Sequence, residues 1–226
     1  MYEKRSLAYI DACKLHDEHT ATLELACSQG CSDCCTINVA VTSLEACIIA
    51  EHIDRLANKD ELWGKLENAK NRNRFIPRLT FNRVADLYEA GEALPPEDDP
   101  DPAWGACPLL VDNHCPIYEY RPFACRAMVS SLTCSGKGFA EMSPLTVSVN
   151  TVLYQYIEDL DRAGVSGNMV DMLLYMRPPE NRKAYKEGKK ISSKQWCVNN
   201  SRLTVIMADP AHRKQLEPIL ESLKRF

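Results

Sequence analysis

Cys27-Ser-Gln-Gly-Cys31-Ser-Asp-Cys34-Cys35 places four thiols within nine residues of the chain. Gaps of three and two residues separate the first three cysteines, and loops this short can turn their sulfur atoms onto one metal centre. Gly30 gives the backbone the freedom that such a turn requires. Successive side chains of an extended chain point to opposite sides. We therefore expect the adjacent pair Cys34 and Cys35 to serve different metal atoms, or different purposes.

A second group of cysteines follows in Cys107-Pro-Leu-Leu-Val-Asp-Asn-His-Cys115-Pro-Ile-Tyr-Glu-Tyr-Arg-Pro-Phe-Ala-Cys125-Arg126. A zinc ion or a cubane iron–sulfur cluster takes about four protein ligands. Seven thiolates therefore exceed the need of one ion or one cluster. Either two centres form, or some of the thiols do not bind metal directly.

Together, the two groups resemble the CxxCxxCC cysteine-cluster family, whose members are described as zinc- or iron-chelating proteins. The resemblance spans residues 27–126 and rests on seven cysteines and on Ile117-Tyr-Glu-x-Arg121-Pro; the first gap is three residues here, where the family pattern has two. It implies a metal centre held by Cys27, Cys31, Cys34, Cys35, Cys107, Cys115 and Cys125. The same cysteine arrangement occurs in flagellin lysine methylases, which look like iron–sulfur enzymes. Methyl transfer from S-adenosylmethionine to a protein substrate is thus the enzymatic alternative.

Thiolate ligands favour zinc or iron in sulfide clusters. Structural zinc sites typically show two compact Cys-x2–4-Cys pairs, whereas the second group here has gaps of seven and nine residues. A [4Fe–4S] cluster is therefore favoured over zinc. Arg121 and Arg126 flank Cys125, and their guanidinium groups would stabilise an anionic cluster. The alternative for both arginines is a salt bridge.

Other cysteines and histidines are weaker candidates. Cys134 and His114 lie close to the second group in sequence, and whether either is a ligand stays open. Cys13, Cys47 and Cys197 stand in apolar or helical surroundings and are expected to be small buried hydrophobes. His16 and His19 are one helical turn apart, which is typical of a metal-binding pair, but a solvated helix face is the commoner case.

Several enzyme classes are disfavoured by missing motifs. The chain has no P-loop, no Gly-rich dinucleotide fingerprint and no Gly-x-Ser-x-Gly elbow. Cys27, Cys31 and Cys34 match the spacing of radical enzymes that use S-adenosylmethionine. Those enzymes carry the motif after the first strand of a βα barrel, and the flanking sequence here predicts helix instead.

The fold predicted from the sequence is mainly α. We expect a single helical domain over residues 1–226, with a metal-binding region at 27–134 whose irregular cysteine-bearing loops close around a metal centre. Helices are predicted over residues 1–25, from Thr42 to about Leu56, twice within 60–92, and over 149–160 and 166–176. A further helix is predicted after Asp209-Pro210, which Pro218 should kink or split. Residues 37–41 are predicted to be extended, and 93–102 form an acidic, proline-rich exposed loop.

Composition bears on location and partners. Eleven cysteines without a secretory signal indicate a reducing compartment, so we expect a cytoplasmic protein. No apolar run approaches the roughly 20 residues of a membrane span. The net charge is −4, but residues 177–194 carry seven positive side chains. That stretch is either a solvated loop or a surface for a protein partner; nucleic acid is not expected, because few aromatic side chains are interleaved with the charges.

Overall fold

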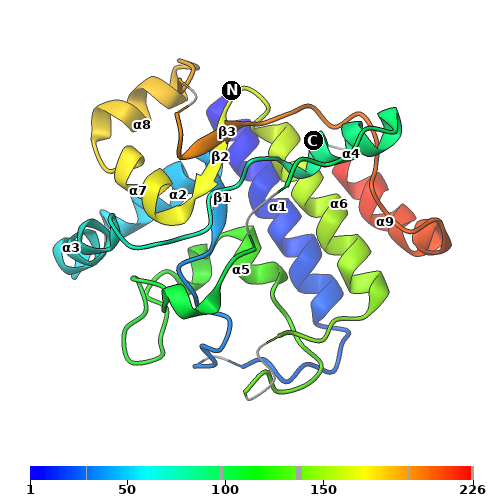
Figure 1. Ribbon diagram of the computed structural model, residues 1–226, viewed down its shortest axis with the longest axis horizontal. Helices are drawn as coiled ribbons and strands as arrows, with labels where there is room; N and C mark the ends of the chain where they lie inside the picture. The colour runs from blue at the N-terminus through cyan, green and yellow to red at the C-terminus, as the bar shows by residue number, and fades with distance from the viewer. Residues whose placement is uncertain (29, 97–98, 136–138, 193, 225–226) are drawn as a thin grey trace.

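The computed structural model describes residues 1–28, 30–96, 99–135, 139–192 and 194–224. Over these ranges the chain forms nine α-helices and one three-stranded sheet (Figure 1). The helices are α1 (Tyr2–Thr20), α2 (Ser43–Ile53), α3 (Lys59–Ala69), α4 (Phe81–Ala90), α5 (Phe123–Ala127), α6 (Pro144–Leu160), α7 (Met169–Met176), α8 (Pro179–Lys186) and α9 (Arg213–Leu223). The strands are β1 (Ala40–Thr42), β2 (Val165–Asn168) and β3 (Cys197–Asn199). The mainly α class is confirmed, with a small sheet that the sequence did not predict.

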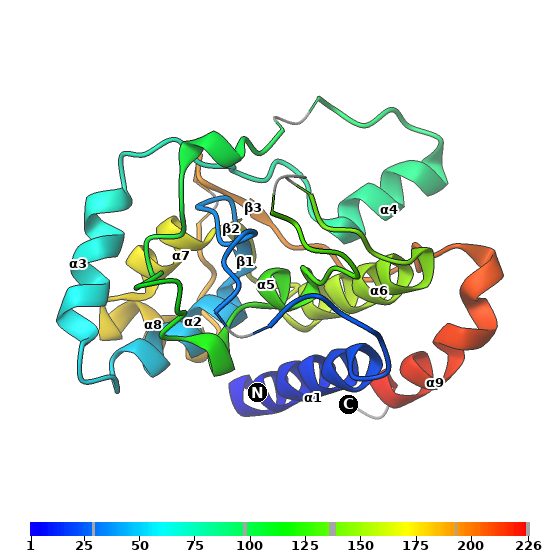
Figure 2. The ribbon, with the colours of Figure 1, turned by 90° about the horizontal axis from the view of Figure 1, so that it is seen from below.

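The core lies between the helices and this sheet. Helix α2 packs against α7, and α1 packs against α6. The fully buried side chains of α2 and α7 include Leu44, Ile49, Ile53, Met172 and Leu173, which belong to one hydrophobic cluster. Figure 2 shows the cysteine-bearing segments in the part of the molecule between α3 and α6. None of the described helices is long and apolar enough to cross a membrane.

The sheet is antiparallel, with β2 in its centre. Val41 of β1 pairs with Gly167, which also pairs with Cys197 of β3. A Cβ atom at Gly167 would stand 2.8 Å from the Trp196 carbonyl oxygen and 3.2 Å from the Met172 side chain, so only glycine allows this close approach. The helix predicted over 166–176 begins only at Met169. Its first three residues form a strand instead, because they pair with a segment more than a hundred residues earlier.

Local signals predicted several helix ends correctly. The Thr42 hydroxyl accepts the Glu45 N–H, and Glu45 accepts the Thr42 N–H at 2.8 Å, which completes the predicted capping box of α2. Gly91 ends α4 in the left-handed conformation, with φ 68°. The first helix ends at Thr20, five residues earlier than predicted. Pro218 lies inside α9.

One buried carboxylate joins four of these elements. Asp161, at the end of α6, has a fully buried side chain. It accepts the Ser43 hydroxyl and the Leu44 N–H at the start of α2, the Arg5 guanidinium at 3.1 Å and the Tyr185 hydroxyl at 2.6 Å. Asp161 therefore fixes the first turn of α2 against α1, α6 and α8.

The predicted loop at 93–102 is exposed over 93–96 and 99–101, and ends in a 3-10 turn at Pro102–Trp104. Residues 97 and 98 lie outside the described part of the chain. Asn38 donates a side-chain N–H to the Asp101 carbonyl at 2.9 Å. The loop therefore returns directly to the segment that follows the first cysteine group.

Candidate metal centre

A short antiparallel ladder joins the two cysteine groups. Thr36 and Ala106 form a β-bridge, the Cys107 N–H donates to the Cys35 carbonyl at 2.9 Å, and the Ile37 N–H donates to the Gly105 carbonyl at 2.9 Å. The ladder sets the last residue of the first cysteine group beside the first cysteine of the second. The two groups therefore lie side by side although an intervening stretch of helices separates them in sequence.

Arg72 holds one segment of this ladder through two hydrogen bonds. Its Nη2 atom donates to the carbonyl oxygens of Trp104, at 3.0 Å, and Ala106, at 3.2 Å. Gly105 lies between these two residues with φ 109°, a conformation that other residues rarely adopt. A Cβ atom at Gly105 would collide with the Arg72 guanidinium group. Gly105 thus allows the two Arg72 hydrogen bonds and the ladder to form together.

A tight turn folds the second group back on itself. Asp112 and Asn113 have φ angles of 48° and 61°, and the backbones of Val111 and His114 pair on either side of them. Two consecutive positive φ angles are typical of a type I′ hairpin turn. The turn brings Cys115 back toward the start of the segment. The Asp112-Asn113 pair is a signal for this turn that the sequence reasoning missed.

The third part of the second group lies on a helix. Cys125 is in the short helix α5, and the residue two positions before it, Phe123, donates its N–H to the buried Glu45 carboxylate at 2.8 Å. Glu45 belongs to α2, so a side chain of the core holds the start of α5 in place. Cys125 is therefore positioned by the rigid frame rather than by a free loop.

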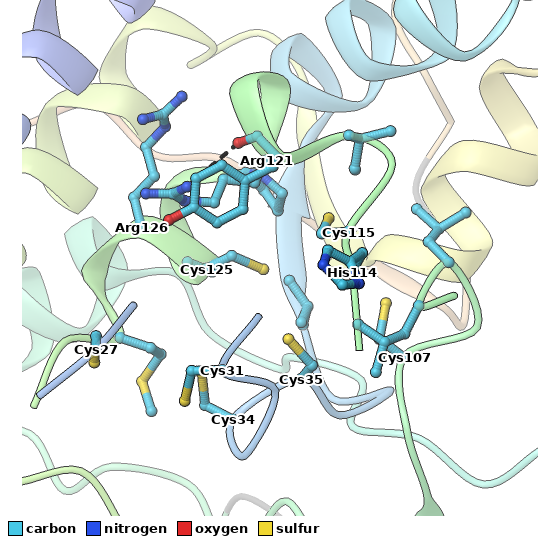
Figure 3. Close-up of a pocket in the computed structure, with 18 of the residues that line it drawn as sticks. Cys27, Cys31, Cys34, Cys35, Cys107, His114, Cys115, Arg121, Cys125 and Arg126 are labelled. Carbon is cyan, nitrogen blue, oxygen red and sulfur yellow. Dashed lines mark hydrogen bonds between the residues drawn. The ribbon is translucent and has the colours of Figure 1, made fainter. Parts of the chain in front are cut away.

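All seven predicted cysteine ligands line one cavity of about 170 Å³, together with His114, Arg121 and Arg126 (Figure 3). An engineered cavity of about 150 Å³ holds one benzene molecule. The space therefore exceeds what a single metal ion fills. In Figure 3 the sulfur atoms of Cys35 and Cys125 point toward the middle of the view, the His114 ring lies between Cys115 and Cys107, and Cys31 and Cys34 lie together lower in the view.

The thiols raise one another's pKa values. Burial, and then the neighbouring Cys115, raise the pKa of Cys107 to about 11. Burial, followed by the charges of Cys107, Cys115 and Cys34, raises the pKa of Cys125 well above its ordinary value. A hydrogen bond with Cys35, together with burial, raises the pKa of Cys34. Because a bound cation stabilises neighbouring thiolates, this donor set fits a thiophilic metal such as zinc or iron.

The two predicted arginines differ in their contacts. The Arg121 guanidinium lies 3.8 Å from the centre of the Tyr118 ring. Its positive charge lowers the pKa of Cys125 and so opposes the effect of burial, which raises that pKa. Arg126 pairs with Asp17 of α1 at 3.0 Å and donates to the Glu119 carbonyl at 2.5 Å. Arg126 thus forms the salt bridge that the sequence left open, while Arg121 faces the thiols with a cation–π contact.

No three His, Cys, Asp or Glu side chains in the described ranges are already placed to hold one metal ion. The seven-cysteine ligand set therefore stays a prediction. His114 has its Nδ1 atom 2.7 Å from the Asp112 carbonyl, so that ring nitrogen is occupied by the turn. Cys134 is outside the lining of the cavity, and its Sγ atom lies 3.9 Å from the Leu132 carbonyl.

The remaining candidates are structural. Cys13, Cys47 and Cys197 are buried, as predicted. His16 is only 1% exposed and packs edge-on against Phe123, with 5.3 Å between ring centres. The expected solvated face is therefore wrong for His16. Burial lowers its pKa to about 4, so the ring is neutral.

The basic stretch at 177–194 is partly helical, since α8 occupies its first half. Arg182 pairs with Asp54, and Lys186 pairs with Glu51. These two cations therefore hold α8 against α2 instead of facing solvent, while Lys183 and Lys190 are exposed. Residue 193 lies outside the described ranges. A protein partner at this surface stays a prediction.

Comparison with known proteins agrees with the cysteine pattern. The family model CxxCxxCC, described as "Putative zinc- or iron-chelating domain", matches residues 26–145, which is just over half of the chain. No curated protein matched. No solved structure matched either. The matched range contains both cysteine groups, the ladder between them and α5.

Proposed function

We propose, from the premise that this chain belongs to the CxxCxxCC family, that it is a metal-binding protein whose two cysteine groups hold an iron–sulfur cluster or zinc. The observation that carries the proposal is the single cavity lined by all seven cysteines of the family pattern. The ladder between Cys35 and Cys107 supports it, because it unites thiols that are far apart in sequence. A bound metal would cross-link these segments, and a cluster would also supply redox chemistry.

A [4Fe–4S] cluster is favoured over zinc. Its ligands can approach from separate directions, and the thiols here come from a loop, a ladder, a hairpin turn and a helix. The cavity also has more room than one ion needs. A chain with eleven cysteines suits a reducing compartment, and a cytoplasmic location is part of the proposal.

The test is purification without oxygen, followed by measurement of iron, zinc and acid-labile sulfide per chain. Iron and sulfide in equal amounts are expected, with a coloured protein whose absorbance bleaches on exposure to a chelator. Zinc without sulfide, in a colourless protein, would overturn the preference for a cluster and leave metal binding intact. A protein with neither metal would refute the proposed function.

A second cavity favours the methyl-transfer alternative. It measures about 320 Å³ and is lined by aromatic rings and by the buried carboxylates of Glu45 and Glu158. Tyr154 in its wall contacts Phe123 with 4.8 Å between ring centres, so the cavity adjoins the helix that carries Cys125. An organic cation such as S-adenosylmethionine suits a wall of aromatic rings. Calorimetry of the metal-loaded protein should then show binding heat, and its absence would remove this alternative.

A further inference from the structure

We propose that Glu45 and Asn150 are positioning residues of the metal centre, which hold α5 at its two ends and so keep Cys125 in place before metal binds. This inference rests on the proposed function, because it concerns how one of the proposed ligands is held. Glu45 belongs to α2 and Asn150 to α6. Neither residue is part of the cysteine pattern, and neither lines the cavity that the cysteines share.

Helix α5 is too short to be stable by itself. It spans five residues, Phe123–Ala127, and isolated helices of fewer than about 12 residues are marginal in water. The first N–H groups and the last carbonyl groups of any helix have no partner within that helix. The N-cap residue of α5 is Pro122, which makes no capping hydrogen bond with its side chain. Helix α5 therefore depends on partners from elsewhere in the fold.

Glu45 supplies the partner at the start of α5. Its carboxylate is buried, and its Oε1 atom accepts the N–H of Phe123, the first residue of α5, at 2.8 Å. The other oxygen, Oε2, accepts the Thr42 N–H at 2.8 Å and the Thr42 hydroxyl at 2.9 Å. One side chain thus joins the first turn of α2 to the first turn of α5.

Asn150 supplies the partner at the other end. Its Nδ2 atom donates to the carbonyl of Ala127, the last residue of α5, at 3.0 Å. The Oδ1 atom of Asn150 is buried and has no hydrogen-bond partner within the part of the chain that the structure describes. A buried polar atom without a partner lowers stability. The bond to α5 therefore explains an asparagine at this position better than its own packing does.

The ring of Phe123 adds a third attachment. It packs edge-on against His16 of α1, with 5.3 Å between ring centres, and against Tyr154 of α6, with 4.8 Å. All of these partners lie on other helices of the core, so their contacts with α5 need no metal ion. Cys125 is the middle residue of α5 and cannot shift without breaking them. A ligand that is already in place loses less freedom on binding, which favours tight binding.

The experiment measures how fast a chelator removes metal from the full-length protein, purified without oxygen, in wild type, Glu45→Gln and Asn150→Leu. The glutamine amide cannot accept from both Thr42 and Phe123, because one of its two terminal atoms is a donor. Leucine has the branched shape of asparagine but no donor for Ala127. Loss of a contact that orients a metal ligand typically weakens metal binding about 10- to 100-fold. We expect both variants to release metal faster by about this factor.

Two matched controls separate this role from a general loss of stability. Asn82→Leu matches Asn150→Leu, because Asn82 is also buried and its Nδ2 atom donates to a main-chain carbonyl of α6 at 2.8 Å. Asp159→Asn matches Glu45→Gln, because Asp159 accepts the distant Leu203 N–H at 3.0 Å. All proteins are checked for folding by circular dichroism and compared well below their melting temperatures. Both controls should melt at lower temperature and release metal at the wild-type rate.

The outcomes decide as follows. Release at the wild-type rate from Glu45→Gln and Asn150→Leu would overturn the proposal while the proposed function stands. Equally fast release from the two controls would also overturn it, because lost stability alone would then explain the effect. If neither variant folds, hydrogen exchange of metal-free wild type decides. Slow exchange of the Phe123 N–H would support the proposal, and exchange as fast as in the exposed loop at 93–96 would overturn it. Wild-type protein purified without any metal would refute the proposed function itself.

Discussion

Replacement of Asp161 by alanine should be among the most destabilising single substitutions in this chain. The carboxylate is fully buried and accepts hydrogen bonds from the side chains of Arg5, Ser43 and Tyr185 and from the Leu44 N–H. Removal of one partner from a buried ion pair costs about 3–5 kcal/mol. Each buried donor left without a partner costs about 1–3 kcal/mol more. Ser43 keeps one interaction, because its hydroxyl oxygen also accepts the Val165 N–H.

One effect opposes these losses. Burial raises the pKa of Asp161, which means that desolvation of the carboxylate already costs stability that the alanine variant regains. We therefore expect a net loss of about 4 kcal/mol in the free energy of unfolding, near the upper end for single substitutions. Against a total of roughly 5–15 kcal/mol, the variant should fold but unfold at a much lower urea concentration.

The assay is urea unfolding followed by circular dichroism at pH 7, with metal content held equal. Asp11→Ala is the control, since Asp11 pairs with the exposed Lys14 and the variant should lose less than about 1 kcal/mol. Asp161→Asn separates charge from shape and should fall between the two. If Asp161→Ala loses no more than the control, the reasoning that this carboxylate joins α1, α2, α6 and α8 is refuted.

Three further predictions concern the site and its support. Gly105→Ala should lower the free energy of unfolding by about 1–3 kcal/mol, because the φ of Gly105 is 109° and the new methyl group meets Arg72. Gly64→Ala, which has open space in α3, should not destabilise the protein. Equal melting temperatures for the two variants would contradict this. Burial raises the pKa of Glu158 from 4.5 to about 7. Its contribution to stability is therefore fully present below about pH 4.5 and lost as the pH rises through about 7. Relative to wild type, Glu158→Gln should gain roughly 2–3 kcal/mol between pH 5 and pH 8 in urea unfolding, and a constant difference would disprove the shift. Removal of metal by a strong chelator should lower the melting temperature. The free energy of unfolding should fall by about 4 kcal/mol if metal is present at a thousandfold excess over its Kd. Calorimetric scans that coincide with and without chelator would argue against a fold stabilised by metal.

Local signals in the sequence predicted local structure well. The Thr42 and Glu45 capping box and the Gly91 cap involve residues within one helical turn, so spacing alone reveals them. Residues 166–168 were predicted as the start of a helix, but they belong to the strand Val165–Asn168, which is set by its pairing with β1 and β3. Pairing over such a distance leaves no short-range signal in one sequence.

The same distinction applies to the site. The resemblance to the CxxCxxCC family implied the seven thiols that line the cavity, because each of the two cysteine groups has a recognisable spacing of its own. The ladder between Cys35 and Cys107 could not be predicted, because neither segment has the length or alternation of a strand. The partner of Arg126 proved to be Asp17, from a helix at the other end of the sequence. What joins the two cysteine groups is therefore a property of the tertiary fold.

The central claim is that cysteine thiolates hold the metal in this protein. X-ray absorption at the edge of the bound metal measures the elements in its first coordination shell directly. The account predicts a shell of sulfur alone, at about 2.3 Å if the metal is zinc, with no nitrogen from His114 or from any other histidine. A shell containing nitrogen or oxygen, or a purified protein with no metal to measure, would contradict it.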